Sequence, residues 1–323
     1  MPNSVNPENT VQLSVVVCTY NRAPILMECL ASLASQPAEG KSFEVIVVDN
    51  NSTDETHEWV SRFIFSKDNF KLVSETKQGL SHARNRGFRE AMAEWVAYID
   101  DDALACEDFV ERILFIISTC DFDCFGGRYV PWYRDGKPYW FRDEYGSNRI
   151  DQSTLGILEK GHLSGGVMVM RKSALIEFNG FPPFLGMRGD TISYGEETYV
   201  QTLFRNAGKR IGYDPELVVR HLVPKHKMRV GWFLSSGFQR GKVSWQSVGK
   251  KPSAVNFFRL FKIMVYDAIY TVIPSTRKLL NGEFFIQNWF IEIFRPQAKN
   301  FGALCGALNM LIRKHYSQGP NTI

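Results

Sequence analysis

The sequence has few cysteines and lacks the patterns in which they bind metal. Six cysteines occur among 323 residues, none of them in a CxxC pair. Cys120 and Cys124 have no His or Cys partner at zinc-ligand spacing, so we expect reduced thiols in a cytosolic protein. The first twelve residues are polar and predict no signal peptide. Each apolar run is shorter than the ~18 residues needed to span a bilayer.

Glycine-rich phosphate-binding loops are also missing. No GxGxxG follows the first predicted strand. The segment that ends in Gly40-Lys41-Ser42 resembles the end of a phosphate loop, but Ser35 stands where that loop requires glycine. A site that cradles phosphate with glycine backbone is therefore excluded for this part of the chain.

Charge is distributed unevenly along a chain of otherwise ordinary composition. With 44% apolar and 22% charged residues, the protein is predicted to be globular, with one large or two moderate domains. Residues 226–323 contain 14 Lys and Arg against 3 Asp and Glu, a net charge of +11, whereas residues 1–225 contain 24 against 31, a net charge of −7. We expect a domain over 1–225 and a basic, aromatic-rich helical region over 226–323, whose charge favours an anionic surface or polymer as partner.

Strand patterns alternate with helix patterns over the first hundred residues. The predicted strands are Leu13–Cys18, Phe43–Val48, Phe70–Ser74 and Trp95–Ile99. This alternation predicts parallel βαβ units, in which ligands bind at the carboxyl ends of the strands. The polar clusters TYNR, DNNSTD and DDD each follow one of these strands directly. We therefore place the functional site at that edge.

Asp100, Asp101 and Asp102 are consecutive carboxylates after a buried strand. They repel one another unless a cation neutralises them. Oxygen ligands of this kind suit Mg²⁺ or Mn²⁺, which commonly also bind substrate phosphates. The simpler alternative is that these acids start a loop and cap the next helix. Three acids in succession favour the metal.

Five segments, in order, resemble the inverting family 2 glycosyltransferases, which have the GT-A fold. They are VVVCTYNR, EVIVVDNNSTD, KQGLSHARNRGF, VAYIDDDA and GEETYVQTLFRNAGKRIGYDPELVVRH, within about residues 12–224. The resemblance implies an α/β fold of GT-A type, with a Rossmann-like, mostly parallel sheet flanked by helices, followed here by a mainly helical C-terminal extension. It also implies a nucleotide-sugar donor and a Mg²⁺ or Mn²⁺ cofactor.

The same resemblance assigns roles to individual residues. Asp102 and His221 are implied as metal ligands, although a lone His is as often structural. A carboxylate accepts a hydrogen bond from a pyrimidine imide, so Asp49 favours a uridine or thymidine donor. The residues implied to contact the nucleotide sugar are Thr19, Asn21, Asp49, Arg84, Asn85, Asp100 and Asp101.

The acceptor side and the catalytic base are implied further along the chain. Ser164, Gly165 and Gly166 line the acceptor side by resemblance, although two glycines also mark β-bulges. Glu197 is implied as the base that deprotonates the acceptor hydroxyl, with Glu196 as the alternative. The family more often has Asp at position 197, and acids at a helix start are favoured by the helix dipole alone.

The C-terminal region contains three apolar, aromatic-rich segments flanked by Lys and Arg: Phe257–Ile273, Phe284–Phe294 and Phe301–Ile312. Apolar faces with basic rims favour helices that lie in an anionic membrane interface. The alternative is a helical subdomain packed on the catalytic part or on a second subunit. Nucleic acid is not expected, because no recognised binding module accompanies the charge.

The expected function is therefore inverting, metal-dependent transfer from a nucleotide-diphosphate sugar, UDP-type favoured, to a hydroxyl of a glycan or lipid-linked saccharide. The alternatives are a sugar nucleotidyltransferase and a non-catalytic scaffold with this fold. The first should show a glycine-rich loop near Cys18, and the second should lack the acids at 49, 100, 102, 196 and 197. The expected location is the cytoplasm, with peripheral attachment to the cytoplasmic face of a membrane as an option.

Overall fold

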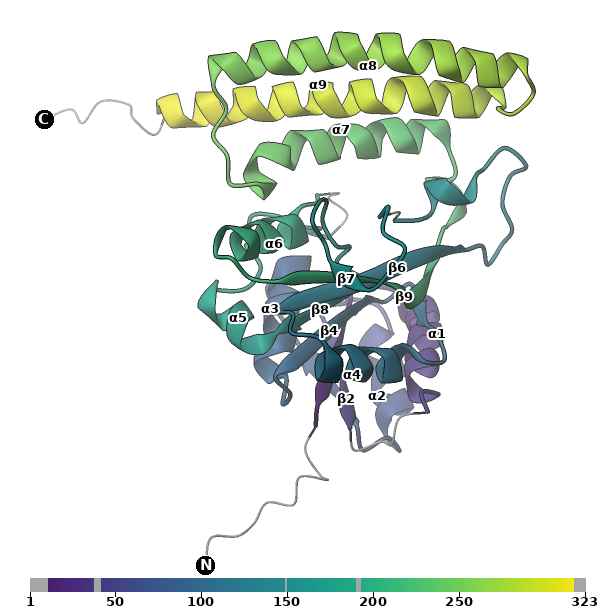
Figure 1. The fold of residues 1–323 in the computed structure, drawn as a ribbon. Helices are drawn as coiled ribbons and strands as arrows, with labels where there is room; N and C mark the ends of the chain where they lie inside the picture. Colours follow the sequence, from purple (N-terminus) through teal and green to yellow (C-terminus); the bar gives the residue numbers. More distant parts are fainter. Residues whose placement is uncertain (1–10, 38–41, 149, 190–192, 317–323) are drawn as a thin grey trace, which may run out of the picture. The chain divides into compact units, whose positions relative to one another are not determined.

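The computed structural model describes residues 11–37, 42–148, 150–189 and 193–316. The chain divides into two compact units (Figure 1). Unit 1 consists of residues 1–132, 143–189 and 196–222, and unit 2 of residues 133–142, 190–195 and 223–323. The expected α/β fold with a helical C-terminal part is confirmed.

The first half of unit 1 is the predicted run of βαβ units. Its elements are β1 (Leu13–Thr19), α1 (Ala23–Ala34), β2 (Phe43–Asp49), α2 (Thr56–Ile64), β3 (Phe70–Ser74), α3 (Leu80–Glu90) and β4 (Trp95–Asp100). All four predicted strands are present, and β1, β2, β3 and β4 pair in parallel. Every residue of β2 is buried, as expected for a central strand covered on both faces.

The second half of unit 1 extends the same sheet with mixed strand directions. Its elements are β5 (Ala103–Ala105), α4 (Phe109–Thr119), β6 (Cys124–Trp132), η2 (Asp143–Tyr145), β7 (Gly156–Ile157), β8 (Val167–Arg171), α5 (Lys172–Glu177), α6 (Glu196–Asn206) and β9 (Ile211–Leu222). The strand order is β3-β2-β1-β4-β8-β6-β9-β5, with β7 on β9. Strand β8 is antiparallel to β4, and β9 is antiparallel to β5.

Hydrophobic cores cover both faces of this sheet. Val15 and Val17 of β1 belong to one core, which also contains Leu30 of α1. Val16 belongs to the other core, with Phe88 of α3. Successive strand residues point to opposite faces, so β1 contributes to both cores. The sheet is thereby fixed between two layers of helices, and its strand ends are held rigidly.

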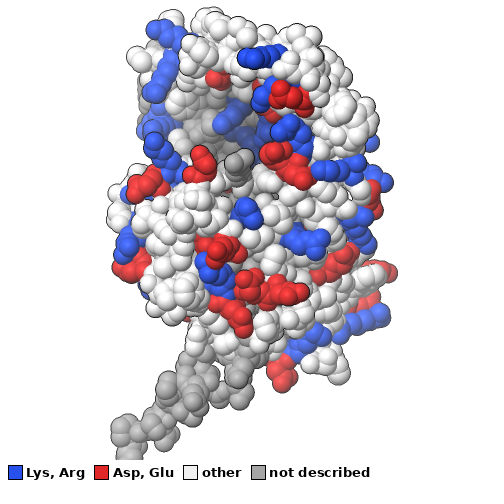
Figure 2. Space-filling view, turned by 45° about the vertical axis from the view of Figure 1, so that its right-hand side comes forward, with Lys and Arg blue, Asp and Glu red and all other residues white. Residues whose placement is uncertain are grey.

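Unit 2 contains η3 (Lys225–Lys227) and three longer helices: α7 (Val230–Ser247), α8 (Ala254–Leu280) and α9 (Ile286–Tyr316). The predicted apolar segment Phe257–Ile273 lies within α8 and Phe301–Ile312 lies within α9, whereas Phe284–Phe294 begins two residues before α9. Figure 2 shows Lys and Arg side chains on this unit with wide uncharged areas between them. Within the described residues, none of the helices is long and apolar enough to cross a membrane.

Glycines bring α7 and α9 into backbone contact. Gly237 and Gly241 are four residues apart on α7, as are Gly302 and Gly306 on α9. A Cβ on Gly241 would lie 1.8 Å from the carbonyl oxygen of Lys299, and one on Gly302 would lie 2.0 Å from that of Phe238. Small residues at this spacing allow two helix backbones to approach closely.

We predict that Gly241→Ala destabilises unit 2. The added methyl group would overlap the α9 backbone, and overpacking of this kind costs about 1–3 kcal/mol. Thermal denaturation should show a lower melting temperature. Gly231→Ala on the same helix is the control, because no atom lies within 4 Å of its Cβ position. Equal melting temperatures for the two variants would contradict this packing.

Candidate active site

The strand register gathers the polar clusters at one edge of the sheet. In the parallel pairs, Thr19 of β1 lies opposite Asp49 of β2, and Cys18 of β1 lies opposite Asp100 of β4. All three strands therefore end at the same level. The loops that follow β1, β2 and β4 meet there, as expected from the sequence.

His221 reaches this edge from a distant part of the chain. It lies in β9, opposite Ala103 of the short antiparallel strand β5, and the amide of Leu222 donates a hydrogen bond to the carbonyl of Asp102 at 2.8 Å. This pairing places His221 Nε2 3.2 Å from Asp102 Oδ1 and 3.9 Å from Asp100 Oδ2. Asp100, Asp102 and His221 each offer a ligand atom, and these atoms all lie within 4.8 Å of one another.

These three residues fit a divalent cation. Two carboxylates and an imidazole form a donor set suited to Mn²⁺, and carboxylates alone suit Mg²⁺. Asp102 is buried, whereas the side chain of Asp100 is 31% exposed. A cation held between them would have one open side, toward solvent or a ligand.

Arg22, to which the sequence analysis assigned no role, holds the other carboxylate oxygens. Its NH1 lies 3.1 Å from Asp101 Oδ1 and 2.8 Å from Asp102 Oδ2. Burial raises the pKa of Asp101 to about 7, and the neighbouring Asp102 raises it too, while Arg22 lowers it. The sequence offered one signal: Arg22 ends the TYNR cluster at the same sheet edge as the carboxylates.

Tyr129 of β6 also escaped the sequence analysis, and no local pattern marks it. Its hydroxyl donates to Asp100 Oδ2 and accepts from the amide of Gly166, both at 3.1 Å. Its ring stacks on His221 with a centroid distance of 4.7 Å and an interplanar angle of 14°. Tyr129 therefore orients two of the three candidate metal ligands.

Gly165 and Gly166 lie directly against the charged residues of this site. Strand β8 begins opposite the end of β4, with Val167 paired to Ile99, so the residues before Val167 face the Asp100 region. A Cβ on Gly166 would lie 2.2 Å from Asp100 Oδ2, and one on Gly165 would lie 2.5 Å from Arg84 NH2. The close approach requires glycine at both positions.

Arg84 of α3 connects the Asp100 region with the acidic pair of α6. Its buried guanidinium lies 2.6 Å from Glu196 Oε1 and 3.8 Å from Asp100 Oδ1. Burial raises the pKa of Glu196 to about 8, the adjacent Glu197 raises it further, and Arg84 lowers it. Glu196 is buried and Glu197 is partly exposed. Glu197 is thus the more accessible carboxylate of the pair.

Asp49 is buried at the end of β2 and keeps part of its hydrogen-bonding capacity. Its Oδ1 accepts from the amide of Ser52 at 3.0 Å, and its Oδ2 lies 3.2 Å from His57 Nδ1. An ionised carboxylate offers about four lone-pair sites. Thr19 lies beside it and is buried. Contact of Thr19 or Asp49 with a nucleoside stays a prediction.

Two predicted nucleotide contacts make hydrogen bonds within the protein. Asn21 accepts from the amide of Thr53 at 2.8 Å and donates to its hydroxyl at 3.2 Å, which shapes the loop after β2. Asn85 donates to the carbonyl of Phe181 and accepts from its amide, both at 2.8 Å. Both side chains hold the loops around the site. Ser164, on the predicted acceptor side, is partly buried, and its role stays a prediction.

Cys18 lies beside Asp100 but does not supply a nucleophile. Burial raises the pKa of its thiol to about 12, and the nearby Asp100 and Asp101 also raise it, while Arg84 lowers it. Since the thiolate is the reactive form, Cys18 stays protonated near neutral pH.

Comparison with known proteins identifies the family. The family model described as Glycosyl transferase family 2 matches residues 14–178, the part of the chain that contains the Asp100–Asp102 cluster. The chain belongs to glycosyl transferase family 2.

Glycosyltransferases of several kinds resemble this chain. Glycosyltransferase AglE of Haloferax volcanii is 33% identical over 125 residues, which cover 38% of this chain and 41% of AglE. The Glucosyl-dolichyl phosphate glucuronosyltransferase of the same organism is 27% identical over 72% of this chain and 75% of its own. Mannosyltransferase PcManGT from Pyrobaculum calidifontis, solved with GDP-Man and Mn²⁺, shares the fold with a TM-score of 0.61 at 20% identity, over 93% of this chain and 87% of PcManGT.

We predict that Gly166→Ala disrupts the family 2 site while leaving the fold intact. The methyl group would displace Asp100 or the hydroxyl of Tyr129, which lies 2.4 Å from the Cβ position. Loss of a residue that orients a metal ligand typically lowers metal affinity about 10–100-fold, so stabilisation by Mn²⁺ should weaken in thermal-shift titrations. Gly156→Ala is the control, since its Cβ would meet only Gln152 at 3.6 Å. Unchanged Mn²⁺ affinity in Gly166→Ala would contradict a metal site that depends on the positions of Asp100 and Tyr129.

Proposed function

We propose that this glycosyltransferase moves a sugar from a nucleotide-diphosphate sugar to a hydroxyl of a glycan or lipid-linked saccharide, with inversion at the anomeric carbon and with a divalent cation. The observation that carries the proposal is the convergence of Asp100, Asp102 and His221 at the carboxyl edge of a family 2 sheet. The family match and the missing glycine-rich loop both weigh against the nucleotidyltransferase alternative.

Asp100, Asp102 and His221 would hold the cation, Mg²⁺ or Mn²⁺. When bound, it neutralises the charge that develops on the leaving diphosphate. Arg22 binds Oδ2 of Asp102, the carboxylate oxygen that does not face His221, and so holds this side chain in place. The Mn²⁺ in the PcManGT complex supports a divalent cation in this fold.

The donor nucleoside is proposed to bind beside Asp49. The unused lone pairs of this buried carboxylate accept a hydrogen bond from an imide N–H, so uridine is favoured. The GDP-Man bound to PcManGT makes a guanosine donor the natural competitor in a donor screen. Arg84, Asn85, Asn21 and Thr19 surround the same edge and complete the proposed binding region.

Glu197 is proposed as the base. Glu196 is buried and forms an ion pair with Arg84. Glu197, the next residue of α6, is partly exposed. The acceptor hydroxyl gives its proton to Glu197 while its oxygen attacks the anomeric carbon. The nucleotide diphosphate leaves from the opposite face, so the configuration inverts and no covalent enzyme intermediate forms. Ser164, Gly165 and Gly166 are proposed to line the acceptor side.

We further propose a lipid-linked acceptor and a cytoplasmic location. Residues 226–323 would make peripheral contact with the membrane. One relative is named Glucosyl-dolichyl phosphate glucuronosyltransferase, and the basic charge of the C-terminal region favours an anionic surface.

We predict that Asp102→Asn abolishes metal-dependent transfer. The change keeps the size of the side chain and removes the charge of a ligand. We would measure thermal stabilisation by a panel of sugar nucleotides with and without Mn²⁺, together with transfer to saccharide acceptors. Asp151→Asn, at an exposed position, is the control. Full transfer in the presence of a chelator would refute metal dependence, and no stabilisation by any sugar nucleotide would refute the proposed donor class.

We predict that Glu197→Gln separates binding from chemistry. The amide keeps the size of the carboxylate but accepts no proton, so kcat should fall about 10²–10⁴-fold while the donor affinity persists. Glu196→Gln is the comparison: it weakens the ion pair with Arg84 and should alter stability as well as activity. Normal turnover of Glu197→Gln with an inactive Glu196→Gln would exchange the two roles.

A further inference from the structure

Helix α8 exposes a long, mostly apolar face, which Lys262 interrupts between Phe258 and Val265. Eleven large apolar side chains on this single helix are 37% exposed or more. Among the described side chains of α8, only Ser275 is buried. The exposed set is Val255, Phe258, Phe261, Ile263, Val265, Tyr266, Ile269, Tyr270, Val272, Ile273 and Leu280. Exposed apolar patches of this extent mark interaction sites.

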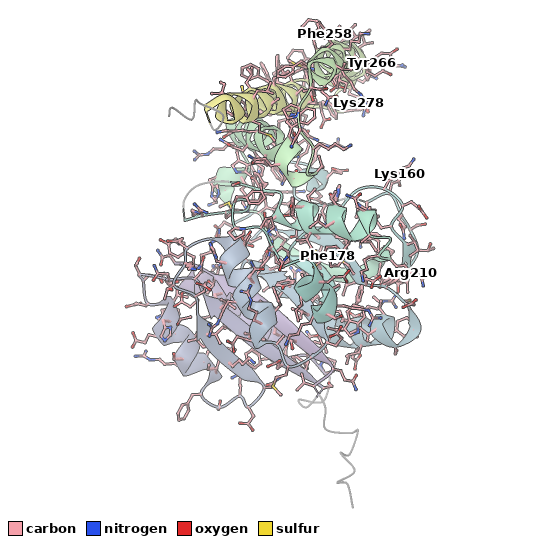
Figure 3. The ribbon with its side chains drawn as sticks, turned by 90° about the vertical axis from the view of Figure 1, so that its left-hand side faces the viewer. Lys160, Phe178, Arg210, Phe258, Tyr266 and Lys278 are labelled. Atoms are coloured by element: carbon pink, nitrogen blue, oxygen red, sulfur yellow. The ribbon has the colours of Figure 1, made fainter. Side chains whose placement is uncertain are left out.

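The spacing of these residues makes the face a stripe along the helix. Val255, Phe258, Val265, Ile269 and Ile273 fall three, four or seven residues apart and therefore lie on one side of the helix. With 27 residues and a rise of 1.5 Å per residue, the helix is about 40 Å long, and the stripe from Val255 to Ile273 takes up about 27 Å of it. Figure 3 shows α8 nearly end-on, with Phe258 and Tyr266 on the side away from α9.

The opposite side of α8 is bound to α9. Asn300 Nδ2 donates to Asp267 Oδ2 at 2.9 Å, and Gln297 Nε2 donates to the carbonyl of Met264 at 3.1 Å. Asp267 is the only acidic residue in the sequence of α8. The exposed face therefore contains no carboxylate.

The charges on the exposed side are positive. Arg259, Lys262 and Arg277 are all exposed. Arg259 and Arg277 are eighteen residues apart, which is five full turns, so they lie on the same edge of the stripe. Long basic side chains can lay their stems along an apolar surface while the charged groups reach polar headgroups. Lys278 differs, because its Nζ lies 5.1 Å from the centre of the Phe284 ring.

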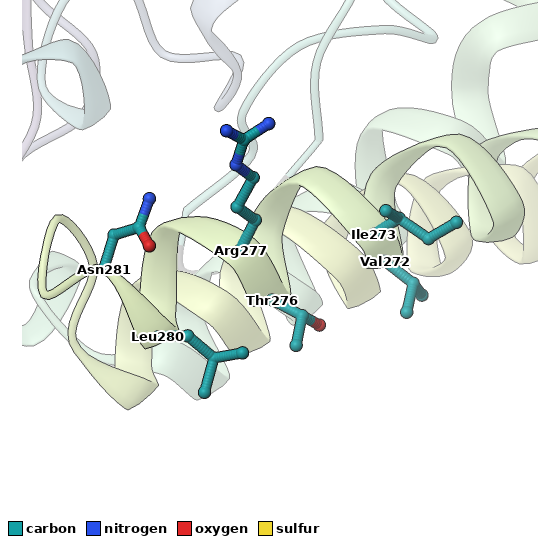
Figure 4. A pocket seen from close by; sticks show the side chains of 6 residues that line it. All are labelled: Val272, Ile273, Thr276, Arg277, Leu280 and Asn281. Atoms are coloured by element: carbon teal, nitrogen blue, oxygen red, sulfur yellow. The ribbon is translucent and has the colours of Figure 1, made fainter.

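Apolar and basic side chains of the last turns of α8 together line a hollow of about 380 Å³ (Figure 4). Its lining includes the apolar side chains of Val272, Ile273 and Leu280 and the basic side chain of Arg277. In the close-up, Arg277 points to the opposite side from Val272 and Leu280. An acyl chain and an anionic headgroup would find separate contacts within two turns of helix.

We propose that α8 is the membrane-contacting helix of this protein and that it lies in the interface of a bilayer containing anionic lipid, with its apolar stripe inserted and Arg259, Lys262 and Arg277 at the headgroups. A second copy of the chain fits this face less well. In a two-fold contact each copy presents the same patch, so the cations would meet with no carboxylate from either α8 face. An interfacial helix of this type inserts about 5–10 Å.

The charge contribution is tested with the full chain and vesicles of phosphatidylcholine, with or without phosphatidylglycerol. The protein should co-sediment with the anionic vesicles at low salt and much less with neutral ones. Each basic residue near an anionic surface changes the partition constant about fivefold, so removing three should lower it about a hundredfold. The test variant is Arg259→Gln with Lys262→Gln and Arg277→Gln, and the matched control on unit 1 is Arg62→Gln with Lys160→Gln and Arg210→Gln. Lys160 and Arg210 are labelled in Figure 3.

The apolar contribution is tested by Phe258→Ser with Ile269→Ser and Ile273→Ser. These side chains are 73%, 56% and 70% exposed, so the melting temperature should not fall, while vesicle binding should drop by about a hundredfold or more. The matched control on unit 1 is Phe65→Ser with Met92→Ser and Ile176→Ser, all at exposed positions.

Three results would overturn the proposal: equal binding to anionic and neutral vesicles, equal losses in the α8 variants and their controls, or a dimer in light scattering that the apolar α8 variant converts to monomer. The last result would assign the face to a second copy of the chain. The inference rests on the membrane contact proposed above for residues 226–323. Because the vesicle assay contains no sugar nucleotide, its failure would remove that contact and leave the proposed sugar transfer intact.

Discussion

The mutual repulsion of Asp100, Asp101 and Asp102 is the constraint on which the site depends. Three carboxylates in succession, two of them buried, are costly in a protein interior unless cations compensate them. Arg22 bonds to Asp101 and Asp102, and Arg84 lies near Asp100. The arrangement leaves Asp102 Oδ1 and the carboxylate of Asp100 turned toward His221, where a divalent cation would supply the remaining compensation.

The residues that surround the three acids meet this need for charge compensation. Positions 165 and 166, just before β8, need glycine because the side chains of larger residues would occupy the space of Arg84 and Asp100. Tyr129 satisfies Asp100 and covers His221 with its ring. Arg84, which lies near Asp100, also pairs with Glu196. It therefore holds the first turn of α6, where Glu197 lies. Charge compensation thereby couples the candidate metal ligands to the proposed base.

Unit 2 is organised by a different interaction. Its helices α7 and α9 approach until their backbones touch at Gly241 and Gly302, and Trp245 Nε1 donates to the carbonyl of Ala303 at 2.9 Å. This close packing leaves α8 in contact with α9 on one side and exposed on the other. The apolar stripe of α8 is therefore accessible to a surface.

Local patterns in the sequence determined the four parallel strands, the polar clusters that end them and the acidic start of α6. Each of these depends on residues close together in the chain: β-branched runs form strands, and Asp and Asn follow them in loops. The mutual positions of Arg22 and Asp102, of Tyr129 and His221, and of Gly166 and Asp100 were decided only by the tertiary structure. Those contacts depend, in the same order, on the parallel pairing of β1 with β4, the parallel pairing of β6 with β9 and the antiparallel pairing of β8 with β4, which join segments some 70 to 90 residues apart. The sequence named most of the charged residues of the site, but pairing between distant strands determined which atoms meet, because strand register is set by packing across the whole sheet.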